Sequence, residues 1–467
     1  MSIHFNQNNT VKKVKSIYAN VGGSVKKIKS VWVDRNGTPT KVYGSAPENL
    51  LIIGAGANRG YSSNYGQPYN DGFLYTEDGD TWKSFSFSKF FESKFSSNYR
   101  GWMNRSKIFN VDDFFVFSMV VYNIYNLTPN SFKFKIYASE DLEDWTELYS
   151  HDIVTEPNSQ NYEIVTEEVD GVPVFKFPVD SSTYYVLTLS HSGSEIDSGW
   201  AANISSTSNI QLTRPVTFSG GNSLGRYLMF TKPEYFCNKY VSVPDNPQSD
   251  STSGLLVSDY LNGSYEVYSE TSASGYRSYS VPIGKINISG EDYLILAFDD
   301  EYSYSKNIAL AYLRSTDGID ITKIHSVFES GHALVIFQNG DTSSNVIRIY
   351  KVFQVGSRYF VTFLIRSGTE SSPVDTYKSY EIYSNNGYLN VRMEINSRID
   401  DIIEFKGNIY VSDGTAIKRV TNFDSGNDFT YETVCSGTIY DGSYSVSPAN
   451  SLGFTKKESW LWIQFLL

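Results

Sequence analysis

The chain has 467 residues, with 39 Lys and Arg against 51 Asp and Glu, and aromatic residues make up 15% of it. This length supplies one large domain or two to three ordinary ones, and its wealth of Tyr, Phe, Gly and Ser favours strands joined by tight turns over helices. The first residues form no apolar leader and no 18 consecutive residues are apolar, so we expect neither a signal peptide nor membrane insertion.

Charge is distributed unevenly along the chain. Residues 1–44 hold eight Lys and Arg and a single acid, Asp34, for a formal charge of +7, whereas the rest holds 31 basic and 50 acidic residues, for −19. We therefore predict two modules, residues 1–45 and 46–467. The basic block has two open interpretations: Lys on the solvated faces of short strands, or a surface for an acidic protein partner. A nucleic-acid partner is not expected, because each Lys cluster lies inside a patterned strand.

The basic module contains an internal repeat. Val-Lys-Lys-Val-Lys-Ser-Ile-Tyr from Val11 recurs as Val-Lys-Lys-Ile-Lys-Ser-Val-Trp from Val25, and a degraded third copy begins at Thr40. Gly22-Gly23 and Asn36-Gly37 fall at equivalent places and are hairpin signals, since both residues of such a turn take positive φ. The repeat therefore predicts a small β-meander, one strand and turn per copy, which needs a neighbour for stability.

This doubled repeat resembles segments at the ends of tail and baseplate-associated proteins in phages of Firmicutes. The resemblance covers about a tenth of the chain. It implies a location on a virion, after synthesis in the host cytoplasm, with residues 1–45 docking to other virion proteins. The residues that it assigns to anchoring are Lys12, Lys13, Lys26 and Lys27.

From about residue 48 the chain alternates between two kinds of segment, which predicts a repeated architecture. One kind is an apolar strand after a polar turn: Leu50 to Ile53, Phe114 to Val121, Tyr184 to Leu189, Tyr227 to Phe230, Tyr293 to Phe298, Ala333 to Phe337, Tyr359 to Ile365 and Ile409 to Val411. The other is a hairpin with Ser or Thr two residues before Asp: Tyr75 to Trp82, Tyr137 to Trp145 and Arg314 to Gly318, with weaker copies at Val257 to Asp259 and Tyr383 to Gly387.

These hairpins resemble the Asp-box, or BNR, hairpin of sialidase-like β-propellers, whose pattern is close to S-x-D-x-G-x-T-W. The first copy is one residue short, the second lacks the Gly, and the third has Ile321 where Trp is expected. In that family the box is a folding device at the periphery and not the active site. The residues that the resemblance makes structural are Asp78, Gly79, Trp82, Ser139, Asp141, Trp145, Asp317 and Gly318.

The spacing of these segments predicts six or seven blades. Residues 190–224 and 241–254 are rich in Ser, Gly, Asn and Asp and are predicted to be long surface loops, where a propeller carries binding residues. The closing segment, Trp460 to Leu467, is predicted to be a buried strand that completes the first blade near Leu50. Such closure removes exposed strand edges.

Residue patterns for catalysis are scarce. Sialidase chemistry needs an Arg cluster and a Tyr paired with a carboxylate, and Arg59 is a lone candidate. The carboxylate runs could serve as glycosidase acids or calcium ligands, but neighbours on a strand point to opposite faces, so we interpret them as solvated turn acids. These runs are Asp112-Asp113, Asp299-Asp300-Glu301 and Asp400-Asp401.

Metal and cofactor signals are also missing from the sequence. The five His and two Cys (Cys237 and Cys435) lack metal-ligand or disulfide spacing, so we expect two buried thiols, no metal and no cofactor.

The sequence thus predicts an all-β fold: a β-propeller of six or seven blades preceded by a small N-terminal β-meander. The favoured function is a non-enzymatic phage tail or baseplate protein whose propeller binds a host-surface glycan or receptor, with homo-oligomerisation supplying avidity. One alternative is a glycoside hydrolase or depolymerase on the same propeller, recognisable by converging carboxylates about 5 to 10 Å apart. The other is a purely structural virion component.

Overall fold

The computed structural model describes strands in the N-terminal segment and most of the chain between residues 49 and 458. The described residues are 4–7, 10–13, 18–21, 24–27, 30–35, 38–44, 49–55, 57–59, 72–103, 108–112, 114–123, 125, 132–153, 165–169, 172–178, 184–192, 196–207, 214–218, 227–231, 233–242, 255–261, 265–268, 278–300, 307–320, 333–338, 346–369, 372–395, 397–423, 428–441, 444–448 and 451–458. Within these ranges there are 40 β-strands and one α-helix, so the predicted all-β class is confirmed.

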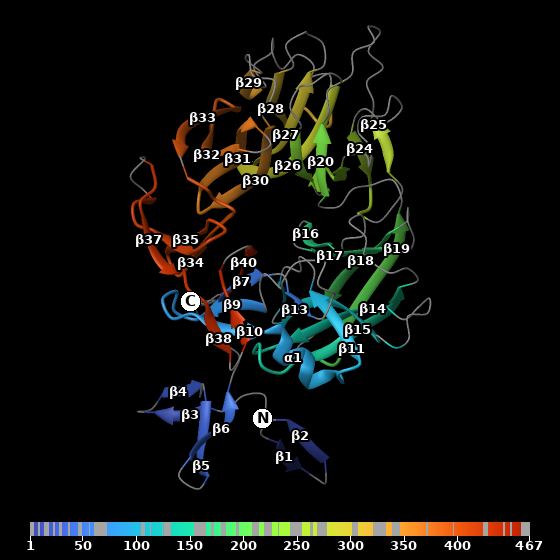
Figure 1. The fold of residues 1–467 in the computed structure, drawn as a ribbon, viewed down its shortest axis with the longest axis vertical. Helices are drawn as coiled ribbons and strands as arrows, with labels where there is room; N and C mark the ends of the chain where they lie inside the picture. Colours follow the sequence, from blue (N-terminus) through green and yellow to red (C-terminus); the bar gives the residue numbers. More distant parts are fainter. Residues whose placement is uncertain are drawn as a thin grey trace, which may run out of the picture.

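Seven antiparallel sheets are arranged around one axis as the blades of a propeller, which confirms the prediction of six or seven blades (Figure 1). From the inner to the outer strand they are blade 1, β40 (Ser451–Glu458), β7 (Asn49–Ala55), β9 (Gly72–Thr76) and β10 (Lys83–Ser86); blade 2, β12 (Phe109–Val111), β13 (Phe114–Asn123), β14 (Phe132–Ser139) and β15 (Thr146–Ile153); blade 3, β16 (Val165–Val169), β17 (Val172–Pro178), β18 (Tyr184–His191) and β19 (Trp200–Thr207); blade 4, β22 (Glu234–Phe236), β23 (Lys239–Ser242), β24 (Leu255–Ser258) and β25 (Glu266–Tyr268); blade 5, β26 (Ser278–Ile288), β27 (Glu291–Asp300), β28 (Asn307–Arg314) and β29 (Ala333–Gln338); blade 6, β30 (Val346–Val355), β31 (Arg358–Thr369), β32 (Ser372–Asn385) and β33 (Tyr388–Ile395); and blade 7, β34 (Asp401–Phe405), β35 (Asn408–Ser412), β36 (Ile417–Val420) and β37 (Tyr431–Cys435).

Further strands extend or accompany these blades. β11 (Tyr99–Met103) pairs with β13 along one edge and with β8 (Ala57–Arg59) along the other. β20 (Arg214–Phe218) and β21 (Tyr227–Thr231) extend the sheet of blade 6, and β38 (Ile439–Asp441) and β39 (Tyr444–Val446) form a hairpin beside β10.

Blade 1 closes the ring because its inner strand comes from the C-terminal part of the chain. β40 pairs antiparallel with β7, with Phe454 opposite Ile53 and Lys457 opposite Leu50. The predicted closure near Leu50 is therefore confirmed, but the closing strand is 451–458. The predicted closing strand, Trp460 to Leu467, lies outside the described residues.

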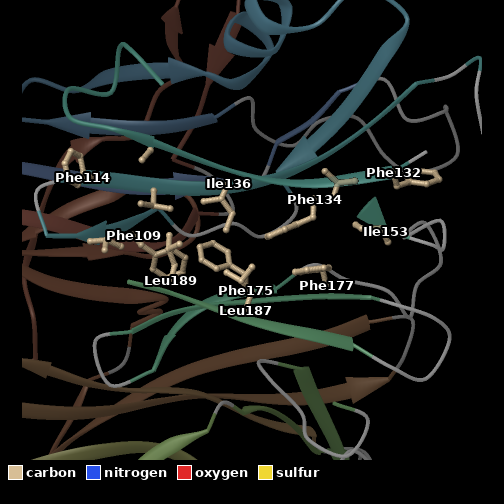
Figure 2. Close-up of a cluster of buried hydrophobic side chains, with 14 of the residues drawn as sticks. Phe109, Phe114, Phe132, Phe134, Ile136, Ile153, Phe175, Phe177, Leu187 and Leu189 are labelled. Atoms are coloured by element: carbon tan, nitrogen blue, oxygen red, sulfur yellow. The ribbon is translucent and has the colours of Figure 1, made fainter. Parts of the chain in front are cut away.

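The hydrophobic core lies between neighbouring blades. Between blades 2 and 3, the rings of Phe134 and Phe177 stack with centroids 4.3 Å apart, and Phe109 meets Phe175 edge-on at 5.6 Å. Figure 2 shows these rings filling the space between the two sheets. A blade between two others buries both of its faces, which explains why β13 is apolar along nearly its whole length instead of alternating with polar residues.

The one helix of the described chain, α1 (Phe87–Lys94), lies in the connection between blades 1 and 2. Ser86 caps it by accepting the backbone N–H of Lys89 at 3.1 Å. Phe87, Phe90 and Phe91 are buried in the core between these two blades. The helix therefore covers the apolar layer that the two sheets leave open.

Two-residue turns join the first and second strands of blades 2 to 7. At 237–238, 289–290 and 406–407 both turn residues have positive φ, including Cys237 at 51° and Lys406 at 51°. This is the geometry of type I′ turns, whose twist matches that of the flanking strands. The turns hold neighbouring strands in register without long loops.

The N-terminal strands form three separate hairpins instead of the predicted continuous meander. β1 (His4–Gln7) pairs with β2 (Thr10–Lys13), β3 (Tyr18–Val21) with β4 (Ser24–Lys27), and β5 (Ser30–Arg35) with β6 (Thr38–Gly44). The strands flank 22–23 and 36–37, where the sequence predicts hairpin turns. The first repeat copy thus supplies β2 and β3 and the second supplies β4 and β5, two strands each instead of one.

One sequence prediction about the propeller is wrong. Residues 190–224 include β19 and β20, although they were predicted to form a loop. β19 is an exposed outer strand, so its polar composition resembles that of a loop. The predicted apolar strand Tyr227 to Phe230 is confirmed as part of β21, which pairs with β20 and β30.

Candidate active site

The up-and-down strand order of each blade places two kinds of connection on opposite faces of the ring. The face that carries the turns from the first to the second strand and from the third to the fourth is here the tight-turn face. The opposite, long-connection face carries the links from the second to the third strand and from blade to blade, including 56–71 and 243–254. Binding residues concentrate on the longer connections of a rigid scaffold, so a site is expected on that face.

Asp78 lies on the tight-turn face, in the hairpin between β9 and β10. Its Oδ1 accepts the backbone N–H of Asp80 at 2.9 Å and of Thr81 at 2.7 Å. Thr76 donates its hydroxyl to the same oxygen at 2.9 Å and accepts the backbone N–H of Gly79 at 2.9 Å. The backbone bonds from Thr81 and Asp80 hold the pKa of Asp78 well below its usual range. The carboxylate therefore caps a turn.

The second hairpin, between β14 and β15, repeats these bonds without the glycine. Ser139 donates to Asp141 at 3.2 Å and accepts the backbone N–H of Leu142 at 2.9 Å. Leu142 stands at the Gly position with a φ of 66°. Trp145, buried like Trp82 of the first hairpin, donates its ring N–H to the Leu142 carbonyl at 3.2 Å.

The third hairpin keeps the spacing but uses its Asp differently. Asp317 receives both guanidinium bonds of Arg314, at 2.7 and 3.0 Å, and Gly318 has a φ of 72°. An ion pair thus occupies the place of the turn cap. Ile321 lies outside the described residues.

The other sequence candidates lie apart from these hairpins. Lys12 and Lys13 are in β2 and Lys26 and Lys27 are in β4, and Arg59 is in β8, but their side chains are outside the described residues. Asp112 lies on the tight-turn face, where its carboxylate contacts His191 Nδ1 at 3.0 Å. The side chains of residues 113 and 299–301 lie outside the described residues as well.

Asp400 and Asp401 differ from the other carboxylate runs because they lie where inner strand β34 begins, on the long-connection face. Asp401 is only 5% exposed and accepts the backbone N–H of Phe454 at 2.7 Å and of Ile402 at 3.0 Å. It therefore ties blade 7 to blade 1. The prediction that this pair consists of solvated turn acids is wrong, because the start of the strand is enclosed by the neighbouring blades.

Asp400 has a different set of partners. Arg398 donates to both of its carboxylate oxygens at 2.8 Å, and the Asp400 side chain is 19% exposed. The guanidinium of Arg398 lies over the ring of Tyr377 in blade 6, 5.1 Å from its centroid. The backbone N–H of Asp400 donates to the carbonyl of Ser412 at 2.8 Å, which extends the β34–β35 ladder and fixes the position of the carboxyl.

Asp413 completes a group that we call the blade 7 carboxylate cluster (Asp400, Asp401 and Asp413). It lies in the turn between β35 and β36, where its Oδ1 accepts the N–H and hydroxyl of Thr415 at 2.9 and 2.7 Å and the N–H of Ala416 at 2.8 Å. Lys418 pairs with its other oxygen at 2.5 Å. Gly414 has a φ of 76°, and a Cβ there would lie 2.5 Å from both Asp400 Oδ2 and Arg398 Nη2. Only glycine lets the ion pair lie over this turn.

The environment pushes the pKa values of two cluster members apart. Burial raises the pKa of Asp400, and the negative charges of Asp413 and Asp401 act in the same direction against the effect of Arg398. Burial acts to raise the pKa of Asp413 too, but the bonds from Lys418, Thr415 and the backbone outweigh it and lower that pKa to about 2. Asp400 therefore keeps its proton to higher pH than an ordinary Asp, beside a carboxylate that stays ionised. Such a split marks the acid in carboxylate-based catalysis.

Within the described ranges, no three or more His, Cys, Asp or Glu side chains are grouped so as to hold a metal ion. Cys435 is buried and Cys237 half-buried, and neither is in a disulfide. In the same part of the chain no helix has the length and apolar character to cross a membrane.

Comparisons with known proteins find similarity in structure alone. No protein family matches the sequence, and no curated protein is similar to it. Among solved structures, an endo-arabinase of Bacteroides thetaiotaomicron is 12% identical with a TM-score of 0.25, covering 73% of this chain and 95% of its own. A family-93 α-L-arabinofuranosidase of Fusarium graminearum, in complex with arabinobiose, is 10% identical with a TM-score of 0.30, covering 76% and 85%. A Trypanosoma rangeli sialidase is 9% identical with a TM-score of 0.27, covering 81% and 58%.

The matched structures include a sialidase and several glycoside hydrolases, whereas the sequence analysis predicts a non-enzymatic protein. The prediction of a non-enzymatic protein is contradicted, since matched structures include glycoside hydrolases and the alternative of the sequence analysis is favoured instead. At this identity the matches concern the fold, so the chemistry must follow from the residues. The sequence names Asp400 as a carboxylate candidate but does not reveal its burial, because that burial depends on blade 6, which is distant in the chain.

Proposed function

We propose that the protein is a glycoside hydrolase in which Asp400 is the proton donor. The observation that supports this most directly is the unlike pair at the start of β34: Asp400 with a raised pKa beside Asp413 with a pKa of about 2. Cleavage of a glycosidic bond needs a carboxylic acid that still holds its proton, and the negative charge of Asp413 favours that state of Asp400. The pair lies on the face where a propeller carries its binding residues.

Each residue around Asp400 has a distinct role in this proposal. Arg398 is a positioning residue, because its two bonds and its contact with Tyr377 fix the plane of the Asp400 carboxyl. Asp413 acts through its charge, since Thr415, Ala416 and Lys418 already bind its oxygens.

The second carboxylate of the reaction is proposed to be Glu234. It begins the inner strand β22 of blade 4 at the same face and is only 7% exposed. Glu side chains are almost never buried to this extent unless they are paired. Glu234→Gln is therefore expected to lower activity as Asp400→Asn does.

The test is release of reducing sugar from arabinan, a sialylated oligosaccharide and Gram-positive cell-wall polysaccharide. Asp400→Asn keeps the shape of the side chain but carries no transferable proton, and loss of a general acid costs roughly 100-fold or more in rate. Glu143→Gln, an exposed change in the tight-turn face, is the matched control and should leave the rate unchanged. Full activity in Asp400→Asn, or no sugar release by the wild type, would refute the proposal.

We also propose that residues 1–45 attach this enzyme to a larger particle, a phage tail or baseplate. The support is the formal charge of +7 and the Lys-bearing repeat, which pairs as three hairpins. A variant without residues 1–45 is expected to keep its hydrolytic rate and to be missing from purified virions. Incorporation at the wild-type level would contradict the attachment role.

A further inference from the structure

A hairpin inserted between blades 3 and 4 makes an unexpected connection across the ring. The chain needs only to pass from β19 to β22 in the adjacent blade, but residues between them form the antiparallel pair β20–β21. β21 then pairs in parallel with β30 of blade 6, with Leu228 opposite Arg348 and Met229 opposite Ile349. It also contacts β26 of blade 5. The hairpin therefore reaches two blades beyond the one that it leads into.

The edge of β30 that receives the hairpin is the one that faces the axis. β31 occupies the outer edge of β30, so β21 takes the inner edge. The inner strands of the adjacent blades, β26 and β34, each end their own sheets. The hairpin thus extends the sheet of blade 6 into the axial space that the other inner strands surround.

The pairing of β21 with β30 also determines the position of the hairpin along the axis of the ring. Residues 348 and 349 belong to the first half of β30, and inner strands begin at the long-connection face. β30 contacts β34, whose start is Asp401. The topology therefore brings β20–β21 to the same end of the ring as the blade 7 carboxylate cluster, one blade away from it.

Its hydrogen bonding makes the hairpin a fixed wall. β21 pairs with β20 along all five of its residues and with β30 at Leu228 and Met229, and neighbouring strands in a sheet lie about 4.8 Å apart. The sequence of β21, Tyr-Leu-Met-Phe-Thr, suits a central strand with buried faces. A strand held in this way leaves the axis only if its ladder breaks.

We infer that the β20–β21 hairpin ends the sugar-binding site, so that the enzyme takes its polysaccharide by a chain end. This inference rests on the proposed glycoside hydrolase function. Cleavage inside a polymer requires the chain to continue past the scissile bond in both directions. A hairpin on the axial edge of blade 6, at the end of the ring that holds the cluster, closes one of these directions.

Two variants remove the wall in different ways. In the first, a Gly-Ser linker replaces residues 214–231. In the second, Met229→Pro keeps the chain length but places Pro in a strand paired on both edges, where it removes a ladder donor. Glu143→Gln, the exposed change in the tight-turn face, is the matched control.

The measurement is the fall in viscosity per reducing end formed on arabinan and on Gram-positive cell-wall polysaccharide. The wild type and the control should release short products with little loss of viscosity, and both hairpin variants should show a several-fold larger loss per reducing end. Internal cleavage by the wild type would overturn the inference, even where neither variant folds. An unchanged pattern in folded, active hairpin variants would overturn it as well and leave the proposed function standing. No cleavage of either polymer by the wild type would overturn both.

Discussion

At the scale of single residues, the surroundings decide what a carboxyl group does in this protein. Asp78 is exposed, and backbone N–H donors keep it ionised, so its pKa is lowered. Asp400 is the same residue type, but burial raises its pKa although Arg398 is bonded to both of its oxygens. Asp78 is a turn cap because hydrogen bonds stabilise its charged form. Asp400 is a candidate acid because desolvation disfavours its charged form.

The Asp78 cap predicts a pH-dependent loss of stability in Asp78→Ala. A lowered pKa contributes stability above the ordinary Asp value of 3.8, and this contribution disappears as the pH falls through the lowered pKa. We expect a loss of about 1 kcal/mol in the free energy of unfolding at neutral pH, as for helix caps, shrinking in strong acid. Denaturant unfolding at both pH values checks this.

The matched control is Glu77→Ala in the same turn. Glu77 is exposed and pairs with Lys83 at 3.3 Å, also at the surface. Its removal should change the free energy of unfolding little. Equal losses in Asp78→Ala and Glu77→Ala would show that the Asp78 bonds do not hold the hairpin.

At the scale of elements, the hairpins of blades 1 and 2 show how one turn tolerates two different residues. Gly79 has a φ of 91°, and a Cβ there would lie 2.0 Å from the Tyr410 hydroxyl, so blade 7 leaves no room for a side chain. Leu142 has the same place in blade 2 with a φ of 66°, but its side chain is buried in the core between blades 1 and 2. Burial of the side chain outweighs the backbone strain.

This balance predicts an unusual order of stability at position 142. Both Leu142→Ala and Leu142→Gly lose the buried side chain, which costs roughly 2 to 5 kcal/mol. Ala keeps the unfavourable positive φ, a strain of about 1 kcal/mol that Gly escapes. We therefore expect Leu142→Gly to unfold at higher denaturant concentration than Leu142→Ala, the reverse of the order in a helix. If Ala is the more stable variant, the left-handed conformation is not strained.

Many of the strands and turns could be predicted from the sequence, because short-range patterns specify them. The apolar strands, the Asp-box spacing and the turns at 22–23 and 36–37 all depend on residues close together in the chain. The parallel pairing of β21 with β30 joins residues more than 100 positions apart. No local pattern reveals such a pairing, and β19 was missed because an exposed outer strand has the composition of a loop.

At the scale of the whole molecule, ring closure creates the environment of the candidate site. Asp401 binds the backbone of Phe454 in blade 1, and Arg398 reaches Tyr377 in blade 6, so three blades meet around the cluster. The sequence indicates a propeller, but the raised pKa of Asp400 exists only in the assembled ring. Because this environment forms only in the ring, the sequence alone leads to two interpretations. The Asp400-Asp401 pair is interpreted as solvated, and the protein is interpreted as non-enzymatic.

The measurement that tests the central claim most directly is the pH profile of sugar release by the wild type and by Asp413→Asn. Asp400 must be protonated to act, so the wild-type rate should fall as the pH rises through its raised pKa. Removal of the negative charge at position 413 lowers the pKa of Asp400, so the falling limb should move to lower pH in Asp413→Asn. If the rate falls at the same pH in the wild type and in Asp413→Asn, the assignment of Asp400 as the proton donor is contradicted.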